Sequence, residues 1–315
     1  MSAIAEPVSG ATAALEITDI SAVPDSPPAE LFYSHRPHLL RSARAAWERR
    51  DVMYTLAERD IRAQYKQAVL GLSWSVFTPL LSLVIFTILF HHVSSLQLKI
   101  PGTDRDVPYA LATFTGMWGW SFFSGAINGG SNSLLANKVL MMKTHFPREC
   151  FPVSQILESA FTSTIAIAPF IVLMGIFTYA PKMATLWVPL YIMVEIPFIL
   201  GVVLLVSAVI VQARDLQQVM GIMVQFAMFA SPIIWQFPEL RHIHIPGIPG
   251  IHNFQIAYSA INPLGPVLGA MKGSILLGQG PPWELLGIAT CSSLFYLVIG
   301  YTVFKRLEVN FADLT

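Results

Sequence analysis

Charged residues are scarce in this sequence. Asp, Glu, Lys and Arg make up only 12% of its 315 residues, whereas soluble globular domains average about 25%. Hydrophobic residues make up 54%, and the mean hydropathy is +0.58. This composition excludes an ordinary soluble domain and indicates a membrane protein. The 19 basic and 19 acidic residues balance, so net charge gives no indication of a nucleic-acid partner.

The sequence also lacks common catalytic motifs and has few cysteines. We interpret its two cysteines, Cys150 and Cys291, as small apolar residues without a disulfide. There is no GxxxxGK[ST] phosphate-binding loop, no HExxH and no GxSxG. The Asp104–Asp106 stretch is interpreted as a solvated charge cluster, and the His242–His244 stretch offers too few ligands for a metal site. We therefore expect no catalytic residue, no metal and no cofactor in this chain.

Basic residues are absent from positions 1–30, which instead hold several acidic residues and the Pro24–Pro28 cluster. A secretory signal needs a basic start and an unbroken apolar core, and neither is present. We expect residues 1–35 to form a flexible cytoplasmic tail.

Basic side chains cluster just before the first long apolar segment. Between them, Leu39, Ala43 and Trp47 recur every four residues, which is typical of an amphipathic helix at a membrane surface. An ordinary solvated helix is the alternative, but no sizeable soluble domain is available to pack against it. We expect an amphipathic interface helix and connector over 36–71. The basic residues are Arg36, Arg41, Arg44, Arg49, Arg50, Arg59, Arg62 and Lys66.

Six apolar segments are long enough to cross a hydrocarbon core of about 30 Å. They predict an all-α membrane domain with six transmembrane helices over 72–315. Six crossings put both termini on one side, and most of the 19 Lys and Arg residues then share that side. The positive-inside rule makes it the cytoplasm. The expected spans are about 72–92, 109–135, 152–177, 186–211, 216–237 and 285–304.

The segment between the fifth and sixth spans does not resemble a simple loop. Phe254–Leu277 consists of two apolar pieces separated by Asn262–Pro266. Each piece is under about 15 residues, which is short for a crossing. We therefore expect a re-entrant hairpin that dips in from the outside, with two further spans as the alternative.

Aromatic residues recur at helical spacing on the expected spans, as Phe114, Trp118 and Phe122 do on the second. Aromatic faces stack on the apolar faces of sugars, so a pore lined by them can pass a glycan. Packing against lipid is the alternative, and it prevails for any single ring. The full set of candidate pore aromatics is Trp74, Phe77, Phe114, Trp118, Phe122, Phe226 and Phe229.

Two glycines and two glutamates inside the expected spans also stand out. Gly125 and Gly129 form a GxxxG pair, which allows helices to approach closely. Glu158 and Glu195 are costly to place in a membrane, so each is a candidate functional group. With no chain of partners for a proton relay, we interpret both as structural.

Five short motifs occur in order over about residues 45–315: Arg59–Trp74, Phe146–Glu149, Arg214-Asp215 with Ser231–Ile234, Asn262–Leu264 and Phe311–Asp313. In this ordered set the chain resembles the membrane subunit of ABC-2 type polysaccharide exporters, which move O-antigens, capsules, teichoic acids or cell-wall galactan. The likeness indicates the family and does not indicate the cargo.

The resemblance implies a pore-forming homodimer in the cytoplasmic membrane, driven by two copies of a separate ATPase subunit that holds ATP and magnesium. The implied cargo is a glycan on a polyprenyl pyrophosphate. Arg59, Arg62 and Lys66 would meet the pyrophosphate at the cytoplasmic mouth, because charge-assisted bonds to phosphate are strong. Anchoring to membrane lipids is the alternative role for these three residues.

The resemblance also assigns roles to two loops. The loop Asn137–Phe151 would dock on the ATPase, and the hairpin around Asn262, Pro263 and Leu264 would cap the pore on the outside. Other functions remain open: an ABC-2 exporter of drugs or lipids, or an ion-coupled secondary transporter. The implied coupling residues are Lys143, Phe146, Pro147, Arg148 and Glu149.

Overall fold

The computed structural model of the chain describes residues 39–66, 73–90, 107–143, 146–242, 253–308 and 311. All of them belong to one compact unit, Pro37–Thr315. Several sequence-based expectations lie outside the described residues: the tail 1–35, the connector 67–71, the Asp104–Asp106 stretch, His244, Ala312 and Asp313.

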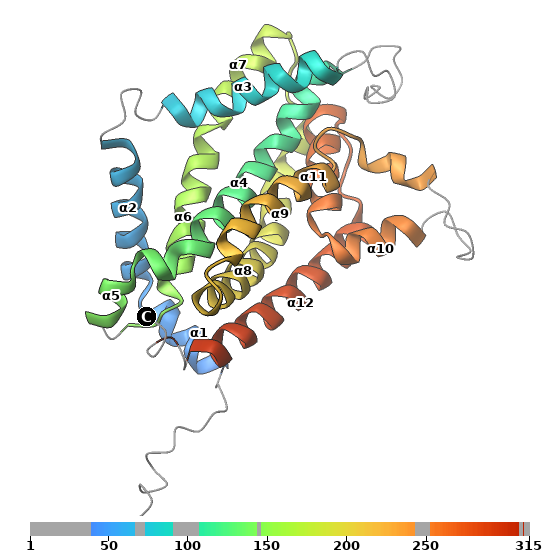
Figure 1. Cartoon of the computed structure of the whole chain (residues 1–315). Helices are drawn as coiled ribbons and strands as arrows, with labels where there is room; N and C mark the ends of the chain where they lie inside the picture. Colours follow the sequence, from blue (N-terminus) through green and yellow to red (C-terminus); the bar gives the residue numbers. More distant parts are fainter. Residues whose placement is uncertain are drawn as a thin grey trace, which may run out of the picture. The chain divides into compact units, whose positions relative to one another are not determined.

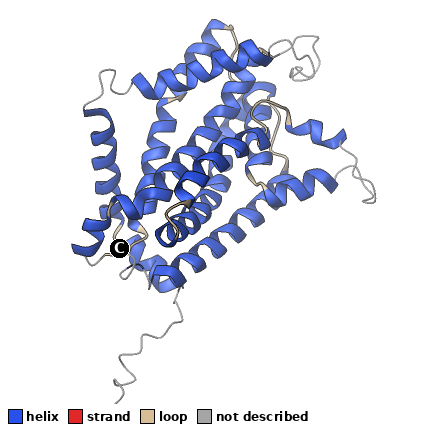
Figure 2. Cartoon of the chain, in the orientation of Figure 1, coloured by secondary structure: helices blue, strands red, loops and turns tan. Residues whose placement is uncertain are grey.

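The described residues fold into helices and the turns between them, with no strand among them (Figure 2). This confirms the predicted all-α class. Within these residues, three helical segments are long and apolar enough to cross a membrane: Cys150–Ile176, Met183–Gln212 and Trp283–Glu308. Shorter apolar helices cover Val76–Leu89, Leu216–Ala230 and Leu264–Leu277, so the count of six crossings stays a prediction.

The amphipathic segment forms two helices where the sequence predicted one, α1 (Leu39–Glu48) and α2 (Arg50–Lys66) (Figure 1). The chain turns at Arg49, whose amide bonds back to the Ala46 carbonyl at 3.1 Å. Met53 and Leu56 on α2 are buried in an apolar cluster with the start of α6 and the end of α12, whereas Trp47 is 70% exposed. The helix pair is therefore anchored by its inner face.

The next elements lie close to the predicted spans. They are α3 (Ser73–Phe90), α4 (Tyr109–Ala136), α6 (Cys150–Ile165), α7 (Ile167–Ile176), the 3₁₀ turn η4 (Met183–Trp187) and α8 (Val188–Gln212). The third predicted span is thus divided at Ala166 into α6 and α7. The loop after α4 holds a short helix, α5 (Lys138–Lys143).

The fifth apolar helix is shorter than the sequence analysis predicted. Helix α9 (Leu216–Ala230) ends at Ala230 and does not continue to Phe237. Ser231 is extended, with φ −94° and ψ 150°, because a residue that precedes a proline is pushed out of the helical region, and Pro232 follows. A 3₁₀ turn, η5 (Phe237–His242), comes next.

The predicted helix–break–helix between the fifth and last apolar segments is present. Helices α10 (Asn253–Ile261) and α11 (Leu264–Lys272) meet at Asn262-Pro263, and a π-helical turn, η6 (Gly273–Leu277), extends α11. Nearly every residue of α11 is buried, and the helix contacts α4, α8 and α12 (Trp283–Glu308). Whether this hairpin re-enters a membrane stays a prediction.

Candidate functional site

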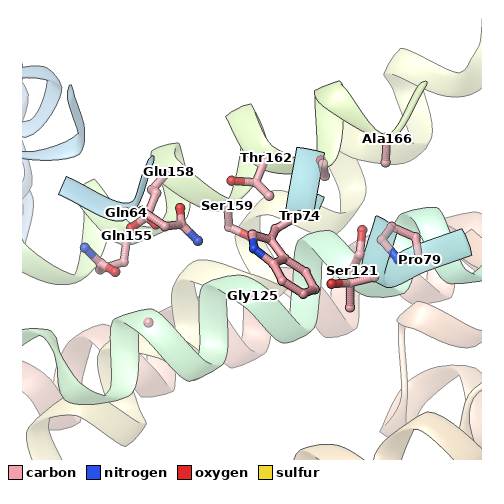
Figure 3. A pocket seen from close by; sticks show the side chains of 13 residues that line it. Gln64, Trp74, Pro79, Ser121, Gly125, Gln155, Glu158, Ser159, Thr162 and Ala166 are labelled. Carbon is pink, nitrogen blue, oxygen red and sulfur yellow. The ribbon is translucent and has the colours of Figure 1, made fainter. Parts of the chain in front are cut away.

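Small and polar residues form a stripe on one face of α4 and another on the facing side of α6 (Figure 3). On α4 the stripe includes Ser121, Gly125 and Asn132; on α6 it includes Gln155 and Thr162. Positions three, four, seven and eight residues apart lie on one side of a helix, so each stripe is a continuous polar face.

The two glycines of the predicted GxxxG pair set the separation of these faces. A Cβ at Gly125 would lie 2.5 Å from Ser159 Oγ, and a Cβ at Gly129 would lie 2.6 Å from Gln155 Oε1. Since non-bonded atoms do not approach this closely, a side chain at either position would force the Ser159 or Gln155 side chain to shift. The close helix approach that the pair predicted is confirmed.

Two adjoining clefts open along these stripes. The upper cleft, beside Trp74 and Pro79, has a volume of about 610 Å³. The lower cleft, beside Arg59 and Asn137, has a volume of about 490 Å³. The two clefts share Gly129, Gln155 and Glu158, so together they form one groove with both polar and apolar surface, which we call the polar groove after its amides and hydroxyls. Each volume falls within the range of about 300–1,000 Å³ that is usual for ligand sites. The upper cleft is lined by Gln64, Trp74, Thr78, Pro79, Ser121, Gly125, Gly129, Gln155, Glu158, Ser159, Thr162, Ser163 and Ala166.

Arg59 stands at the lower cleft in a small polar network. Its guanidinium pairs with Asp60 at 2.7 Å and donates to Asn137 Oδ1 at 2.8 Å. Asp60 in turn accepts a hydrogen bond from Gln155 Nε2 at 2.8 Å. The network joins α2 to the ends of α4 and α6. The Arg59 side chain is still 46% exposed, so a ligand can reach it.

The three predicted phosphate-binding cations do not gather at one point. Arg59 lines the lower cleft, whereas neither Arg62 nor Lys66 lines either cleft. Arg62 pairs with Glu58 on the exposed side of α2, and Lys66 is also exposed. The structure therefore favours Arg59 over its two neighbours as an anion contact.

The candidate pore aromatics separate into a buried pair and a more exposed set. Phe114 and Phe122 are buried within the subunit, with 1% and 6% exposure, and Phe114 stacks on Phe170 at 5.6 Å. Other helices cover most of the circumference of α4. The regular spacing of these aromatics therefore reflects packing against neighbouring helices. These two residues therefore do not line a surface of this chain, and the sequence interpretation of them is corrected.

The other aromatics lie nearer to solvent or lipid. Trp74 lines the upper cleft, with Phe77 edge-on to it at 5.7 Å. Trp118 donates from Nε1 to the Ser163 carbonyl at 2.8 Å, which ties α4 to α6. Phe226 and Phe229 are exposed on α9. Trp74 is thus the aromatic that the structure places in the polar groove.

The loop predicted to dock on an ATPase is bound to the last helix. Glu149 is 2% exposed and pairs with Lys305 at 2.5 Å, and Tyr301 donates to the same carboxylate oxygen at 3.1 Å. Arg148 donates to the Glu308 carbonyl and lies 5.7 Å above the ring of Phe311. Phe146 packs on Phe151, at 5.4 Å between ring centres, and Pro147 is half-buried. Lys143 is the exposed member of this set.

Two of the sequence motifs meet at the hairpin. Asn262 Nδ2 donates to Ser231 Oγ at 3.2 Å and to Tyr258 Oη at 2.9 Å, while Tyr258 donates to the Ala230 carbonyl. Pro263 and Leu264 are buried beside this junction. The end of α9 and the α10–α11 turn are therefore fixed to each other.

The polar stripes themselves were not identified from the sequence. Gln155, Ser159 and Thr162 recur on one face of a predicted span, as do Ser121, Asn128 and Asn132. This helical recurrence of polar residues is the signal that would have found them.

Comparison with known proteins identifies one family model and several relatives that share a name. Residues 51–266 match a family model described as "ABC-2 type transporter". Two relatives from Klebsiella pneumoniae, both named "O-antigen export system permease protein RfbA", are 24% and 23% identical over 265 residues, or 84% of this chain and 95% of theirs. A Myxococcus xanthus protein of the same name is 21% identical over 275 residues, covering 87% of this chain and 99% of its own length.

Proposed function

The chain belongs to the ABC-2 type transporter family, and from this premise we propose that it is the membrane subunit of an exporter of lipid-linked polysaccharide. It is an integral membrane protein, since it combines family membership with long apolar helices. The names of three relatives that it matches over nearly their full length support a polysaccharide as cargo.

The polar groove between α4 and α6 is the observation that carries this proposal. Apolar helices that cross a membrane cannot leave amides and hydroxyls facing hydrocarbon without a large cost. A groove with Gln64, Gln155 and Thr162 on its walls therefore suits a polar occupant. Sugar hydroxyls supply both donors and acceptors to such walls. Arg59 at the lower end supplies a cation for a pyrophosphate.

The rest of the assembly follows from the family and the charge pattern. Two copies of the chain, each with six crossings and both termini in the cytoplasm, form the pore in the cytoplasmic membrane. Two ATPase subunits bind ATP and magnesium and dock on the loop Asn137–Phe151. The hairpin α10–α11 caps the pore on the outside.

Reconstitution of the chain with its ATPase in liposomes tests the proposal. The probe is a short oligosaccharide on polyprenyl pyrophosphate, and the measurement is its ATP-dependent movement together with stimulated ATP hydrolysis. We expect Arg59→Gln to raise the half-maximal probe concentration about tenfold, because a charge-assisted contact is lost. Arg62→Gln, on the exposed side of the same helix, is the matched control and changes it less than about twofold.

Two results would count against the proposal. Transport by the purified chain alone, driven by an ion gradient, would identify a secondary transporter. Movement of drugs or free lipids with no response to the glycan probe would identify an exporter of another cargo. Equal behaviour of Arg59→Gln and Arg62→Gln would remove Arg59 from the pyrophosphate site.

A further inference from the structure

The charges on the walls of the polar groove are unevenly distributed. Figure 3 shows the 13 described residues that line the upper cleft, and Glu158 is the one charged side chain among them. The lower cleft shares Glu158 and adds the Arg59–Asp60 pair. Among the described lining residues, positive charge is therefore confined to the lower end.

Uncharged hydrogen-bonding groups supply most of the other polar side chains on a wall that also has apolar surface. In the described part of the chain, the side chains of Gln64, Asn128, Asn132 and Thr162 form no hydrogen bond. Amides and hydroxyls of this kind can donate to and accept from the hydroxyls of a sugar. They cannot neutralise a carboxylate.

An acidic sugar would meet an unfavourable environment in the upper cleft. Its carboxylate would lose hydration without gaining a cation, since the described walls hold none there. It would also approach the Glu158 carboxyl, which lies where the two clefts join. Like charges in a partly buried groove repel each other more strongly than in water.

We propose that the groove selects uncharged glycans, with Glu158 as the residue that disfavours acidic sugars and Arg59 as the contact for the pyrophosphate at the lower end. This inference rests on the proposed export function. It adds the class of substrate: chains of neutral sugars, with negative charge confined to the lipid carrier.

The test uses the reconstituted complex with its ATPase and two probes on the same polyprenyl pyrophosphate. One probe carries a neutral oligosaccharide of hexoses, and the other is a matched oligosaccharide with alternating hexuronic acids. We expect the neutral probe to be moved at least about tenfold faster at equal concentration. Glu158→Gln, which keeps the size of the side chain, should reduce this preference about threefold or more, chiefly through faster movement of the acidic probe.

Two further variants sharpen the result. Thr162→Lys places a cation on the α6 wall of the upper cleft and should increase movement of the acidic probe. Glu284→Gln removes an exposed carboxylate on α12, outside this groove, and should leave the preference unchanged.

The possible results distinguish selectivity for neutral glycans from the export function on which it rests. Equal movement of both probes by the wild-type complex would overturn the selectivity and leave the export function standing. Movement of neither probe by a complex that hydrolyses ATP would overturn the export function itself. A preference that persists in Glu158→Gln would overturn the role of Glu158.

Discussion

At the scale of single residues, two glycines allow α8 and α12 to approach closely. A Cβ on Gly300 of α12 would lie 1.9 Å from the Gly201 carbonyl oxygen of α8. A Cβ on Gly201 would lie 2.5 Å from the backbone of Tyr296. Backbone atoms cannot move aside as a flexible side chain can, so any larger residue would separate the two helices.

Gly300→Ala should therefore destabilise the protein. Overpacking of this kind costs about 1–3 kcal/mol, and we expect a lower apparent melting temperature for the purified chain in detergent. Gly287→Ala is the matched control on the same helix, because a Cβ there meets nothing within 4 Å. Equal melting temperatures for the two variants would show that α8 and α12 do not pack as closely as described.

At the scale of elements, the loop between α4 and α6 forms a unit with the end of α12. The ion pair between Glu149 and Lys305 is nearly buried, with side-chain exposures of 3% and 10%. Lys305 also pairs with Glu308 at 2.7 Å. A buried ion pair costs desolvation, so its value for stability depends on these additional contacts. Movement of the loop would be transmitted to α12 through this cluster.

Because of this arrangement, charge reversal at two positions of the loop should have different effects. Arg148→Glu should lower stability by about 1–3 kcal/mol, since it leaves the Glu308 carbonyl unpaired and adds an acid near Glu149. Lys143→Glu, on the exposed end of α5, should leave the melting temperature unchanged and weaken copurification with the ATPase. If Lys143→Glu copurifies as well as the wild type, α5 is not part of the docking surface.

At the scale of the whole molecule, the charge pattern and the apolar helices together predict the topology. Lys182 and Arg214 flank the two ends of the segment Met183–Gln212 and are both exposed. With the N-terminus in the cytoplasm, the fourth crossing runs inward, so position 182 faces outside and position 214 faces the cytoplasm.

Cysteine labelling of whole cells checks this topology. In a Cys291→Ala background, Lys182→Cys should react with a membrane-impermeant maleimide added outside, and Arg214→Cys should react only after the cells are opened. Cys150 is fully buried and should stay unlabelled, which makes it an internal control. Labelling of both new cysteines from the same side would contradict a crossing by Met183–Gln212.

The sequence by itself determined most of the helices and one end of the site. Helices α4 and α8 begin and end within a few residues of their predicted spans, because hydropathy and helical period are local properties. Arg59 and Trp74 were identified as candidates and do line the groove. The end of α9 also had a local cause, the Ser231-Pro232 step, although hydropathy alone extended the helix past it.

The tertiary structure alone decided which helix faces meet. Periodicity defines the faces of α4 but does not say which part of a face other helices cover, so Phe114 and Phe122 are buried while Ser121 and Gly125 line the groove. Likewise, Tyr301 meets Glu149 across 152 positions of sequence. Such contacts depend on how several helices pack together, and no local pattern in one segment carries that information.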